Sequence, residues 1–315
     1  MEKIILVGTG PMAVDYSNVL QAMSKKFTVI GRGATSANVF KEKTGVAPIT
    51  GGVENYLLNT KIEKHTNAII ATGTEALMPT MLQLLRAGVT RILIEKPAAL
   101  SIEELIENEE EVKPFEDSIF VAYNRRFYGA VLETERLIEE DGGLESMHFE
   151  FTEWAHKIEP LQKAEGVKEN WFFANSTHVV ELAFFLAGKP KNWNCFSKSG
   201  ELNWHPKTNF SGAGKTEKDV LFSYISNWES AGRWAIELFT KNKRIYLKPM
   251  EKVQVQLKGT IPVVEHEVDL SIDNEFKPGL YKQVDAFVNN NDEGRLLNLK
   301  EHMYNSKTIY ATMLQ

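Results

Sequence analysis

The sequence has one cysteine, no excess of positive charge and no long apolar run. Because Cys195 stands alone among 315 residues, no intrachain disulfide can form, and a reducing, cytoplasmic compartment is the simplest expectation. Lysine and arginine number 36 against 42 aspartate and glutamate residues, and the net charge of −6 argues against general binding to nucleic acid or membrane surfaces. No stretch approaches about 18 uncharged apolar residues and no secretory leader pattern is found, so neither a spanning helix nor export is expected.

Apolar runs alternate with helical patterns through the first 122 residues. Short runs without internal alternation are typical of parallel strands that are covered on both faces. The predicted strands are 3–7, 27–31, 67–72, 90–95 and 118–122, and the predicted helices are 11–24, 34–44, 75–88 and 101–112. With 43% hydrophobic residues and this length, the chain is expected to form two domains.

The second part of the chain has a different pattern. Many strand-like segments follow one another without helices between them, which is typical of an antiparallel sheet. The predicted strands are 145–153, 191–198, 218–227, 231–239, 243–248, 252–258 and 262–270, the predicted helices are 128–140, 176–187, 277–290 and 298–314, and 200–217 is predicted to be a long polar loop. The sequence therefore predicts domains at 1–122 and 123–315, the second an α+β domain, and leaves open that the last helices pack back on the first domain.

A glycine-rich turn follows the first predicted strand. It reads Gly8-Thr9-Gly10-Pro11-Met12-Ala13, a G-x-G-x-x-A pattern between a strand and a helix. Gly8 suits the tight turn, Gly10 lets the backbone approach a pyrophosphate, and Ala13 allows close packing of helix and strand. The amides at the start of the helix attract phosphate charge. This context predicts a Rossmann-type domain that binds a dinucleotide.

The end of the second predicted strand bears on which dinucleotide is bound. A carboxylate at this place would contact the ribose hydroxyls of NAD, whereas this chain has Gly31-Arg32-Gly33 followed by Thr35 and Ser36. A guanidinium pairs with the 2′-phosphate of NADP. Arg32 and Ser36 therefore favour NADP(H), with NAD(H) still possible.

A lysine stands at the end of the fourth predicted strand, in Glu95-Lys96-Pro97. Parallel sheets bind ligands at the carboxyl ends of their strands, so Lys96 is expected at the functional edge. Hydride transfer at a carbinol or carbonyl carbon requires a group that takes or supplies the hydroxyl proton, and a lysine with a lowered pKa can do so. Taken alone, such a lysine is more often a surface charge.

Several short motifs occur together in one order. They are GTGPMA at 8–13, IIAT at 69–72, EKP at 95–97, YNRRF at 123–127 and STHVVEL at 176–182, with a late helix at 278–288. This layout resembles the glucose–fructose oxidoreductase/inositol dehydrogenase/MocA family over the first 190 residues. The resemblance implies that Lys96 is the proton relay, that His178 is the catalytic histidine, and that Glu95, Thr72 and Asn124 lie near the nicotinamide.

One position departs from the family pattern. The family commonly has an aspartate four residues before the histidine, and this chain has Ala174 there, with Asn175 beside it. Alanine cannot relay a proton, and an amide is no base. A cofactor-binding sensor or regulator with little catalysis therefore remains an alternative, as does transient use of the cofactor in a net hydrolysis or epimerisation.

The expected substrate is a small molecule of sugar type. Indole rings offer a flat apolar surface for a sugar ring, and arginine suits a carboxylate or phosphate. The candidate substrate residues are Asn124, Arg126, Trp154, Trp171, Asn175 and His178, with Arg125 as a further cation.

Other patterns are set aside or point to assembly. The run 211–216 resembles the tail of a phosphate-binding loop but lacks its first glycine, and the scattered histidines 148, 156, 205, 266 and 302 show no metal-ligand spacing, so no metal is predicted. The face of the antiparallel sheet suggests a homo-oligomer contact, although the same residues would also suit a core. These residues are Trp228, Trp234, Ile236, Leu238 and Tyr246.

Overall fold

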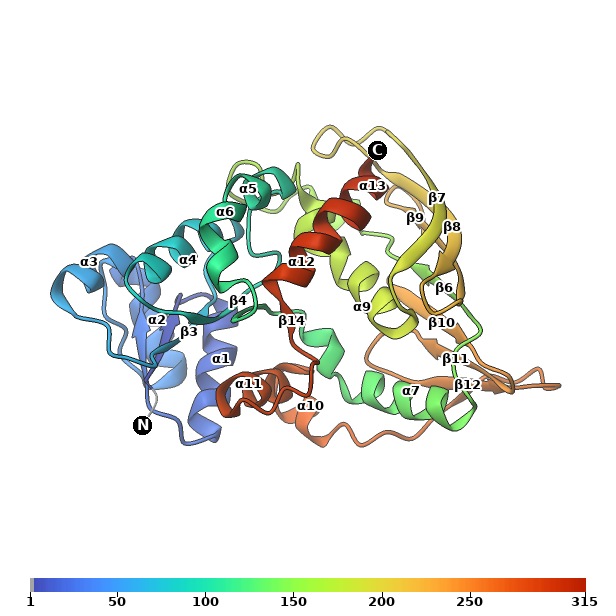
Figure 1. The fold of residues 1–315 in the computed structure, drawn as a ribbon, viewed down its shortest axis with the longest axis horizontal. Coiled ribbons are helices and arrows are strands. Elements are labelled where there is room, and N and C mark those ends of the chain that lie inside the picture. The colour runs from blue at the N-terminus through green and yellow to red at the C-terminus, as the bar shows by residue number, and fades with distance from the viewer. Residues whose placement is uncertain (1–2) are drawn as a thin grey trace. The chain divides into compact units, whose positions relative to one another are not determined.

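The computed structural model describes residues 3–315 and divides into two compact units (Figure 1). The first unit comprises the residues up to Asn124 together with Glu275–Tyr304, and the second comprises Arg125–Asn274 together with Asn305–Gln315. The predicted domains treat each part as one continuous stretch, whereas each unit is assembled from two stretches of chain. The short elements η3 (Asn124–Phe127) and α10 (Ser271–Glu275) span points where the chain passes from one unit to the other.

The first unit is built on a six-stranded sheet with the order β14-β5-β4-β3-β1-β2. Its strands are β1 (Ile4–Val7), β2 (Phe27–Ile30), β3 (Asn67–Ile70), β4 (Arg91–Ile94), β5 (Ile119–Val121) and β14 (Leu297–Asn298). The first five are parallel, and β14 pairs antiparallel with β5. Every residue of β1 and β3 is buried, so both faces of the sheet are covered. The predicted parallel sheet is confirmed, and β14 was not predicted.

Helices follow the strands of the first unit as the alternating pattern predicts. They are α1 (Pro11–Ala22), α2 (Ala34–Thr44), α3 (Gly52–Asn59), η1 (Thr74–Ala76), α4 (Leu77–Arg86), α5 (Ile102–Glu107), α6 (Glu109–Val112), η2 (Lys113–Phe115), α11 (Leu280–Asn289) and α12 (Leu299–Asn305). The predicted start at Ser101 is confirmed, because its hydroxyl accepts from the amide of Glu104 at 3.2 Å. The short helix α3 was not predicted.

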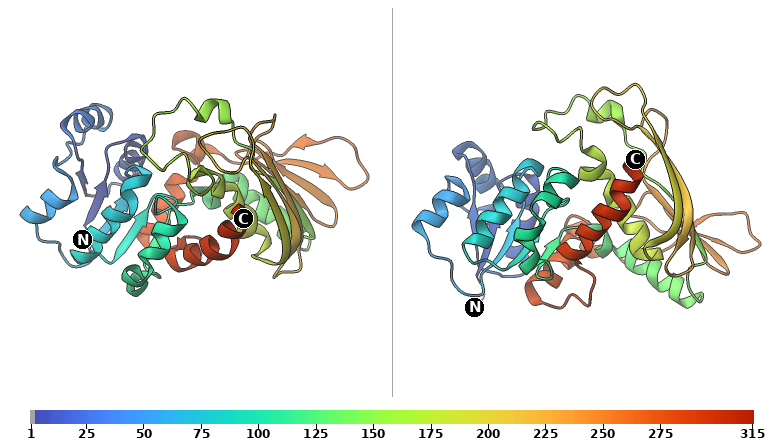
Figure 2. Two further views of the ribbon diagram at one scale, coloured as in Figure 1. Left: turned by 90° about the horizontal axis from the view of Figure 1, so that it is seen from above. Right: turned by 45° about the horizontal axis from the view of Figure 1, so that its top comes forward.

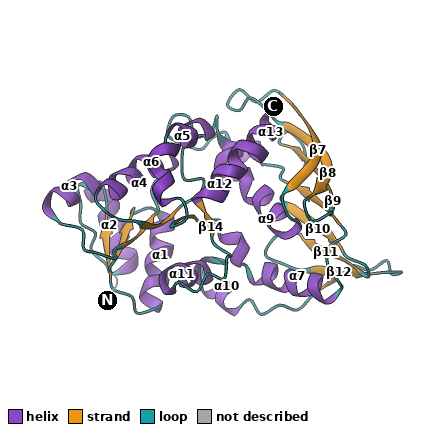
Figure 3. Cartoon of the chain, viewed as in Figure 1, coloured by secondary structure: helices purple, strands orange, loops and turns teal. Residues whose placement is uncertain are grey.

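The second unit is built on an eight-stranded sheet with the order β13-β12-β11-β10-β6-β9-β8-β7 (Figure 3). Its strands are β6 (Ser146–Glu150), β7 (Pro190–Lys198), β8 (Asn209–Thr216), β9 (Leu221–Asn227), β10 (Ala235–Phe239), β11 (Lys243–Leu247), β12 (Gln254–Leu257) and β13 (Val264–Glu265). Its helices are α7 (Gly129–Glu140), α8 (Ala155–Ile158), η4 (Phe172–Ser176), α9 (Thr177–Ala187), η5 (Ser306–Tyr310) and α13 (Ala311–Leu314). All neighbours are antiparallel except β6 and β9, so the predicted mostly antiparallel sheet is confirmed.

The helices of the second unit lie on one face of this sheet (Figure 2), and that face carries the core. Trp228, Trp234, Ile236 and Leu238 are buried, so for these four residues the alternative that they form a core is the correct one. Tyr246, the fifth residue of the predicted contact, is half-buried and lies opposite Glu237 on the other face. The outward face carries other apolar side chains, with Phe196 74% exposed and Leu221 and Ile225 also exposed. For the four buried residues the prediction assigned the wrong face of the sheet. Successive residues of a strand point to opposite faces, so an error of one position exchanges the outward face and the core face.

Two predicted segments of the second unit were wrong. The predicted loop 200–217 contains the strand β8, which pairs with both β7 and β9. Its sequence is polar and glycine-rich for a reason that only packing shows: a Cβ on Gly212 would lie 2.5 Å from the ring of Tyr224. The predicted strand 262–270 is reduced to the two residues of β13. Among residues 3–315, no helix combines the length and apolar character that crossing a bilayer requires.

Candidate functional site

The turn after β1 requires glycine at its first position. Gly8 has φ +126°, and a Cβ there would lie 2.2 Å from the carbonyl oxygen of Ala71, at the end of β3. The amide of Gly8 donates to the carbonyl of Ile30 in β2 at 2.9 Å. The first glycine therefore holds the ends of three adjacent strands together.

The second glycine has a different environment. Gly10 caps α1 with an extended backbone, Pro11 occupies the first turn, and no side chain accepts a hydrogen bond from the amides there. The first turn carries no acidic residue, and a Cβ on Gly10 would meet no described atom within 4 Å. Packing thus does not demand glycine at this position, and the space beside the first amides of α1 is open within residues 3–315. The α1 terminus fits a pyrophosphate.

The end of β2 lies beside this turn. The hydroxyl of Thr9 donates to that of Ser36 at 3.0 Å, and the Ser36 hydroxyl donates to the carbonyl of Gly33 at 3.2 Å. Arg32 is exposed, and within residues 3–315 it makes no ion pair or side-chain hydrogen bond. The structure therefore brings the predicted residues Thr9 and Ser36 into contact, and Arg32 lies just after β2 with a guanidinium that makes no ion pair within residues 3–315.

The ends of β3 and β4 carry the next candidates. Thr72 follows β3, and its hydroxyl donates to the carbonyl of Gly73 at 3.3 Å. Glu95 follows β4 and accepts a hydrogen bond from the Tyr16 hydroxyl of α1 at 2.8 Å. Burial raises the pKa of the Glu95 carboxyl, although the charge of Lys96 and the Tyr16 bond oppose that rise. The Lys96–Pro97 peptide is cis.

A buried histidine holds this segment from the other side. His302 of α12 is 0% exposed, and its Nε2 lies 2.9 Å from the carbonyl oxygen of Pro97, so this nitrogen is the one that carries the proton. Burial lowers the pKa of His302 to about 4, and its bond to Pro97 only partly offsets that fall. His302 is therefore neutral at pH 7 and ties α12 to the turn that presents Lys96.

We expect this histidine to make the protein less stable in weak acid. Between pH 6.5 and 4 the unfolded chain protonates this side chain and the folded chain does not, so stability falls as the pH falls through that range. The expected loss is about 3 kcal/mol from His302 alone. Urea unfolding at several pH values should show a smaller loss for His302→Gln and the wild-type loss for exposed His156→Gln. Equal slopes for wild type and His302→Gln would contradict the assignment.

Asn124 and Lys277 of the first unit make contacts that the sequence did not predict. The Asn124 amide donates to the carbonyl of Pro278 at 2.9 Å, so at least part of its hydrogen-bonding capacity serves the start of α11. Lys277, which the sequence did not single out, places Nζ 2.8 Å from the sulfur of Met12 in α1. Its charge also acts on Asp15 and Glu95. Lys277 is thus a cation at the N-terminal end of α1.

The predicted catalytic histidine lies in the second unit. His178 is a buried residue in the first turn of α9, and its ring centroid is 6.1 Å from that of Trp234. A single π-helical turn, η4, precedes α9 and contains the buried Ala174. Such turns occur often at functional sites, because the extra residue redirects the side chains that follow.

A buried carboxylate that sequence reasoning missed holds the π-helical turn. Glu153 is 1% exposed, and Asn175 Nδ2 donates to its two oxygens at 3.0 and 3.2 Å. The hydroxyl of Ser176 donates to Oε1 at 2.8 Å. Burial raises the pKa of Glu153, and these bonds and the charge of Arg233 oppose the rise. The only sequence signal was a glutamate just after a strand, which is too common to single out.

The other predicted substrate residues are placed differently from one another. Arg126 is 4% exposed and pairs with the equally buried Glu181, donating from Nε at 2.8 Å, so its charge is used inside the unit. Trp171 is half-buried, its ring centroid 6.5 Å from that of Trp204. Trp154 is 45% exposed, and its Nε1 donates to the carbonyl of Gly232 at 2.9 Å.

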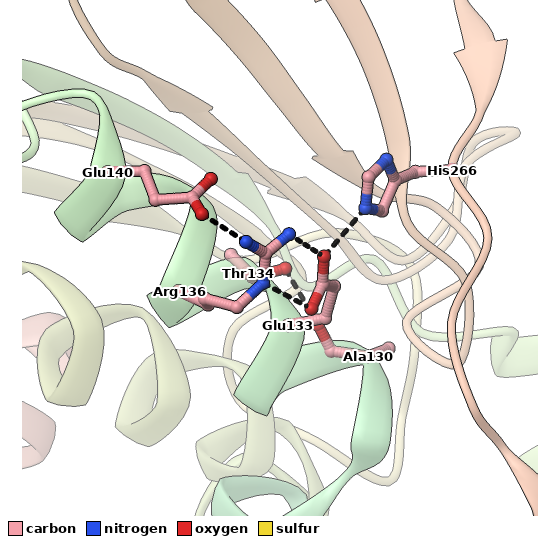
Figure 4. Close-up of polar contacts among 6 residues, drawn as sticks. All are labelled: Ala130, Glu133, Thr134, Arg136, Glu140 and His266. Atoms are coloured by element: carbon pink, nitrogen blue, oxygen red, sulfur yellow. Dashed lines mark hydrogen bonds and ion pairs between the residues drawn. The ribbon is translucent and has the colours of Figure 1, made fainter.

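A polar cluster on α7 involves one of the scattered histidines (Figure 4). Glu133 accepts from Arg136 at 2.6 Å and lies 2.6 Å from His266 Nε2. Arg136, and then His266, lower the pKa of Glu133 to about 2. Within residues 3–315, no group of three histidine, cysteine or acidic side chains is arranged to hold a metal. The cluster joins α7 to the segment after β13.

Comparison with known proteins places the first domain in a family. Residues 3–123 match the family model described as an oxidoreductase family with an NAD-binding Rossmann fold, named GFO_IDH_MocA. No curated protein matches the chain.

Solved structures share the fold over nearly the whole chain. An oxidoreductase from Agrobacterium radiobacter, in complex with NAD+, L-tartaric acid and magnesium, is 11% identical, with a TM-score of 0.76, over 99% of this chain and 96% of that one. Levoglucosan dehydrogenase with NADH and L-sorbose is 16% identical, with a TM-score of 0.75 and coverage of 99% and 96%. UDP-N-acetylglucosamine 3-dehydrogenase from Acidithiobacillus ferrooxidans is 12% identical, with a TM-score of 0.71 and coverage of 100% and 99%. The first domain of the chain, residues 3–123, thus matches the model of the glucose–fructose oxidoreductase/inositol dehydrogenase/MocA family of oxidoreductases with an NAD-binding Rossmann fold.

Proposed function

We propose that this protein is an NADP(H)-preferring oxidoreductase that moves a hydride between the nicotinamide and a carbohydrate-like hydroxyl or keto group. The observation that carries the proposal is the start of α1, where amides without a side-chain cap adjoin Gly10 and the exposed Arg32 lies nearby. Amides of this kind bind a pyrophosphate, and the free guanidinium suits a 2′-phosphate. NAD(H) remains the alternative cofactor, and two of the structures described above contain NAD+ or NADH.

The protein groups have separate tasks in this proposal. When bound, the nicotinamide accepts or supplies the hydride at the substrate carbon. The amine of Lys96 takes the hydroxyl proton during oxidation and returns it during reduction, and His178 assists. Glu95 and Thr72, at the strand ends beside the glycine turn, are proposed to line the nicotinamide ribose. A sugar-type substrate is supported by the names of levoglucosan dehydrogenase and UDP-N-acetylglucosamine 3-dehydrogenase, whose fold this chain shares.

We expect Arg32→Asp to weaken NADPH binding by about tenfold or more while leaving NADH binding nearly unchanged. The substitution removes a phosphate partner and adds a repelling charge, whereas NADH has no 2′-phosphate to lose. Calorimetric titration with both nucleotides checks this, and Arg86→Gln, which alters an exposed pair with Glu111, is the matched control. Equal losses for both nucleotides would remove Arg32 from the phosphate site.

The alternatives separate in one assay. Ala174 is the observation that favours a sensor or regulator, because the π-helical turn offers no carboxylate of its own. A panel of sugars with NADP+ and NADPH, followed at the absorbance of reduced nicotinamide, supports the oxidoreductase if any sugar turns over. Tight nucleotide binding with no turnover favours the regulator, and product without net change in the cofactor favours transient redox chemistry.

The single cysteine supports a cytoplasmic location for the protein. We also infer that the protein forms a homo-oligomer. The proposed contact is the outward face of the large sheet, where Phe196 of β7 and Leu221 and Ile225 of β9 are exposed on the two strands that flank β8. Sedimentation of the wild-type protein as a monomer at micromolar concentration would contradict this inference.

A further inference from the structure

Two guanidinium groups of the second unit lie against one buried indole. Cζ of Arg125 and Cζ of Arg233 are each 4.7 Å from the ring centroid of Trp234. The two carbon atoms are therefore separated by no more than twice that distance. The same indole contacts the imidazole of His178. Two positive charges thus lie close to the histidine to which the proposed function assigns part of the chemistry.

Within residues 3–315, Arg125 forms no direct ion pair, although the carboxylates of Glu251 and Glu153 are near enough to act on its charge. Within residues 3–315 its guanidinium has ring contacts with Trp234 and Tyr128, and its Nε is buried without a hydrogen-bond partner. The next residue gives the contrast, because Arg126 is paired with the buried Glu181. Burial lowers the pKa of Arg125, the charges of Tyr128, Glu251 and Glu153 oppose that fall, and the charge of Arg233 adds to it, but an arginine remains charged at physiological pH. A buried donor without an acceptor is costly, and an anionic ligand would supply the acceptor.

Arg233 also keeps hydrogen-bonding capacity. Its nearest carboxylate oxygen belongs to Glu153, 3.7 Å away, which is beyond a hydrogen bond. Both Glu153 oxygens already accept from Asn175, and one also accepts from Ser176. The Arg233 side chain is 44% exposed and stacks over the indole of Trp154 at 4.6 Å. The guanidinium of Arg233 therefore contacts two indole rings, and no hydrogen bond to it is found among residues 3–315.

We propose that this cluster binds a negatively charged substituent of the substrate, so that the substrate is an acidic sugar, a uronate or a sugar phosphate, and not a neutral one. The inference rests on the proposed function, because it places the anion beside His178. The planar fork of arginine suits the two oxygens of a carboxylate or phosphate. A neutral sugar would leave the Arg125 guanidinium without a charged acceptor in the complex.

Binding of matched sugars tests the inference. NADPH is titrated first by calorimetry, and the saturated protein is then titrated with glucuronate, galacturonate, glucose 6-phosphate, glucose and galactose, with tryptophan fluorescence as a second readout. We expect at least one acidic sugar to bind about tenfold or more tightly than its neutral counterpart. The uronate and phosphate arms identify the anion. Equal affinity for neutral and acidic sugars, or no acidic sugar bound, overturns the inference.

Variants tie the effect to the two arginines. Arg125→Met and Arg233→Gln should each reduce the preference for the acidic sugar by about tenfold, and Arg125→Lys should retain part of it. Arg136→Gln removes one exposed positive charge of the same unit, on α7, and should change nothing. An unchanged preference in both Arg125→Met and Arg233→Gln overturns the inference even if Arg125→Lys binds normally. Loss of NADPH binding in the wild-type protein would instead contradict the proposed function, so the two failures are distinguishable.

Discussion

Replacement of Lys96 by methionine is expected to lower turnover by about 10³-fold while NADPH binding stays within about threefold of wild type. Lys96 follows β4 at the edge of the sheet where the glycine turn lies, and methionine keeps the length of the side chain without an amine. Loss of proton transfer affects the chemical step, whereas the phosphate contacts proposed for the start of α1 are unaffected. Turnover on the sugar that responds in the panel and calorimetry with NADPH measure the two quantities separately.

The control for this substitution is Lys113→Met, which removes an exposed lysine of the same unit whose one ion pair within residues 3–315 is with Glu110. Its turnover should equal that of wild type. If Lys96→Met turns over at the wild-type rate, Lys96 has no part in the mechanism. If the variant loses NADPH binding as well as turnover, Lys96 acts through the cofactor and not through the proton.

Truncation of Glu181 to alanine should destabilise the second unit by about 3–5 kcal/mol. The guanidinium of Arg126 would then remain buried without the Glu181 carboxylate, and removal of one partner of a buried ion pair costs more free energy of folding than the intact pair contributes. Arg126 also stacks over the ring of Phe185 at 4.4 Å, so it has little freedom to reach solvent. Urea unfolding followed by tryptophan fluorescence measures the loss.

The double variant Arg126→Met, Glu181→Met provides the decisive comparison. It removes both charges and keeps much of the volume, so it should be more stable than Glu181→Ala alone. A double variant that is less stable than Glu181→Ala would contradict this account of the pair. If Glu181→Ala is nearly as stable as wild type, Arg126 does not depend on this pair and becomes a candidate for substrate binding again.

Local patterns were sufficient for much of the first unit. The strands β1 to β5 were predicted within one or two residues, because buried parallel strands are short apolar runs. Residues close together in the sequence form the turn at Gly8 and Gly10 and the helix cap at Ser101. The sequence alone was therefore enough to predict both features. The family resemblance that these motifs carried is confirmed for residues 3–123.

The pairing of strands and the hydrogen-bond partners of buried side chains were harder to predict from the sequence. The strand β8 appeared to be a loop, because the close approach of Gly212 to Tyr224 involves a neighbouring strand. The outward and core faces of the large sheet were exchanged, since alternation alone does not tell which phase meets the helices. Glu153 was missed because its partners Asn175 and Ser176 lie more than 20 residues away.

The amino-acid sequence by itself determined the strands β1 to β5, the glycine-rich turn after β1 and the places of Arg32 and Lys96 at strand ends, because each depends on backbone preferences and on neighbours a few residues away. Only the tertiary structure decided that Arg126 forms a buried ion pair while the adjacent Arg125 does not. It also decided that the neutral imidazole of His302 binds the carbonyl of Pro97, next to Lys96, and that Glu153 accepts hydrogen bonds from the turn before His178. The physical reason is that the charge state and availability of a side chain depend on burial and on partners, and residues far apart in the sequence supply both.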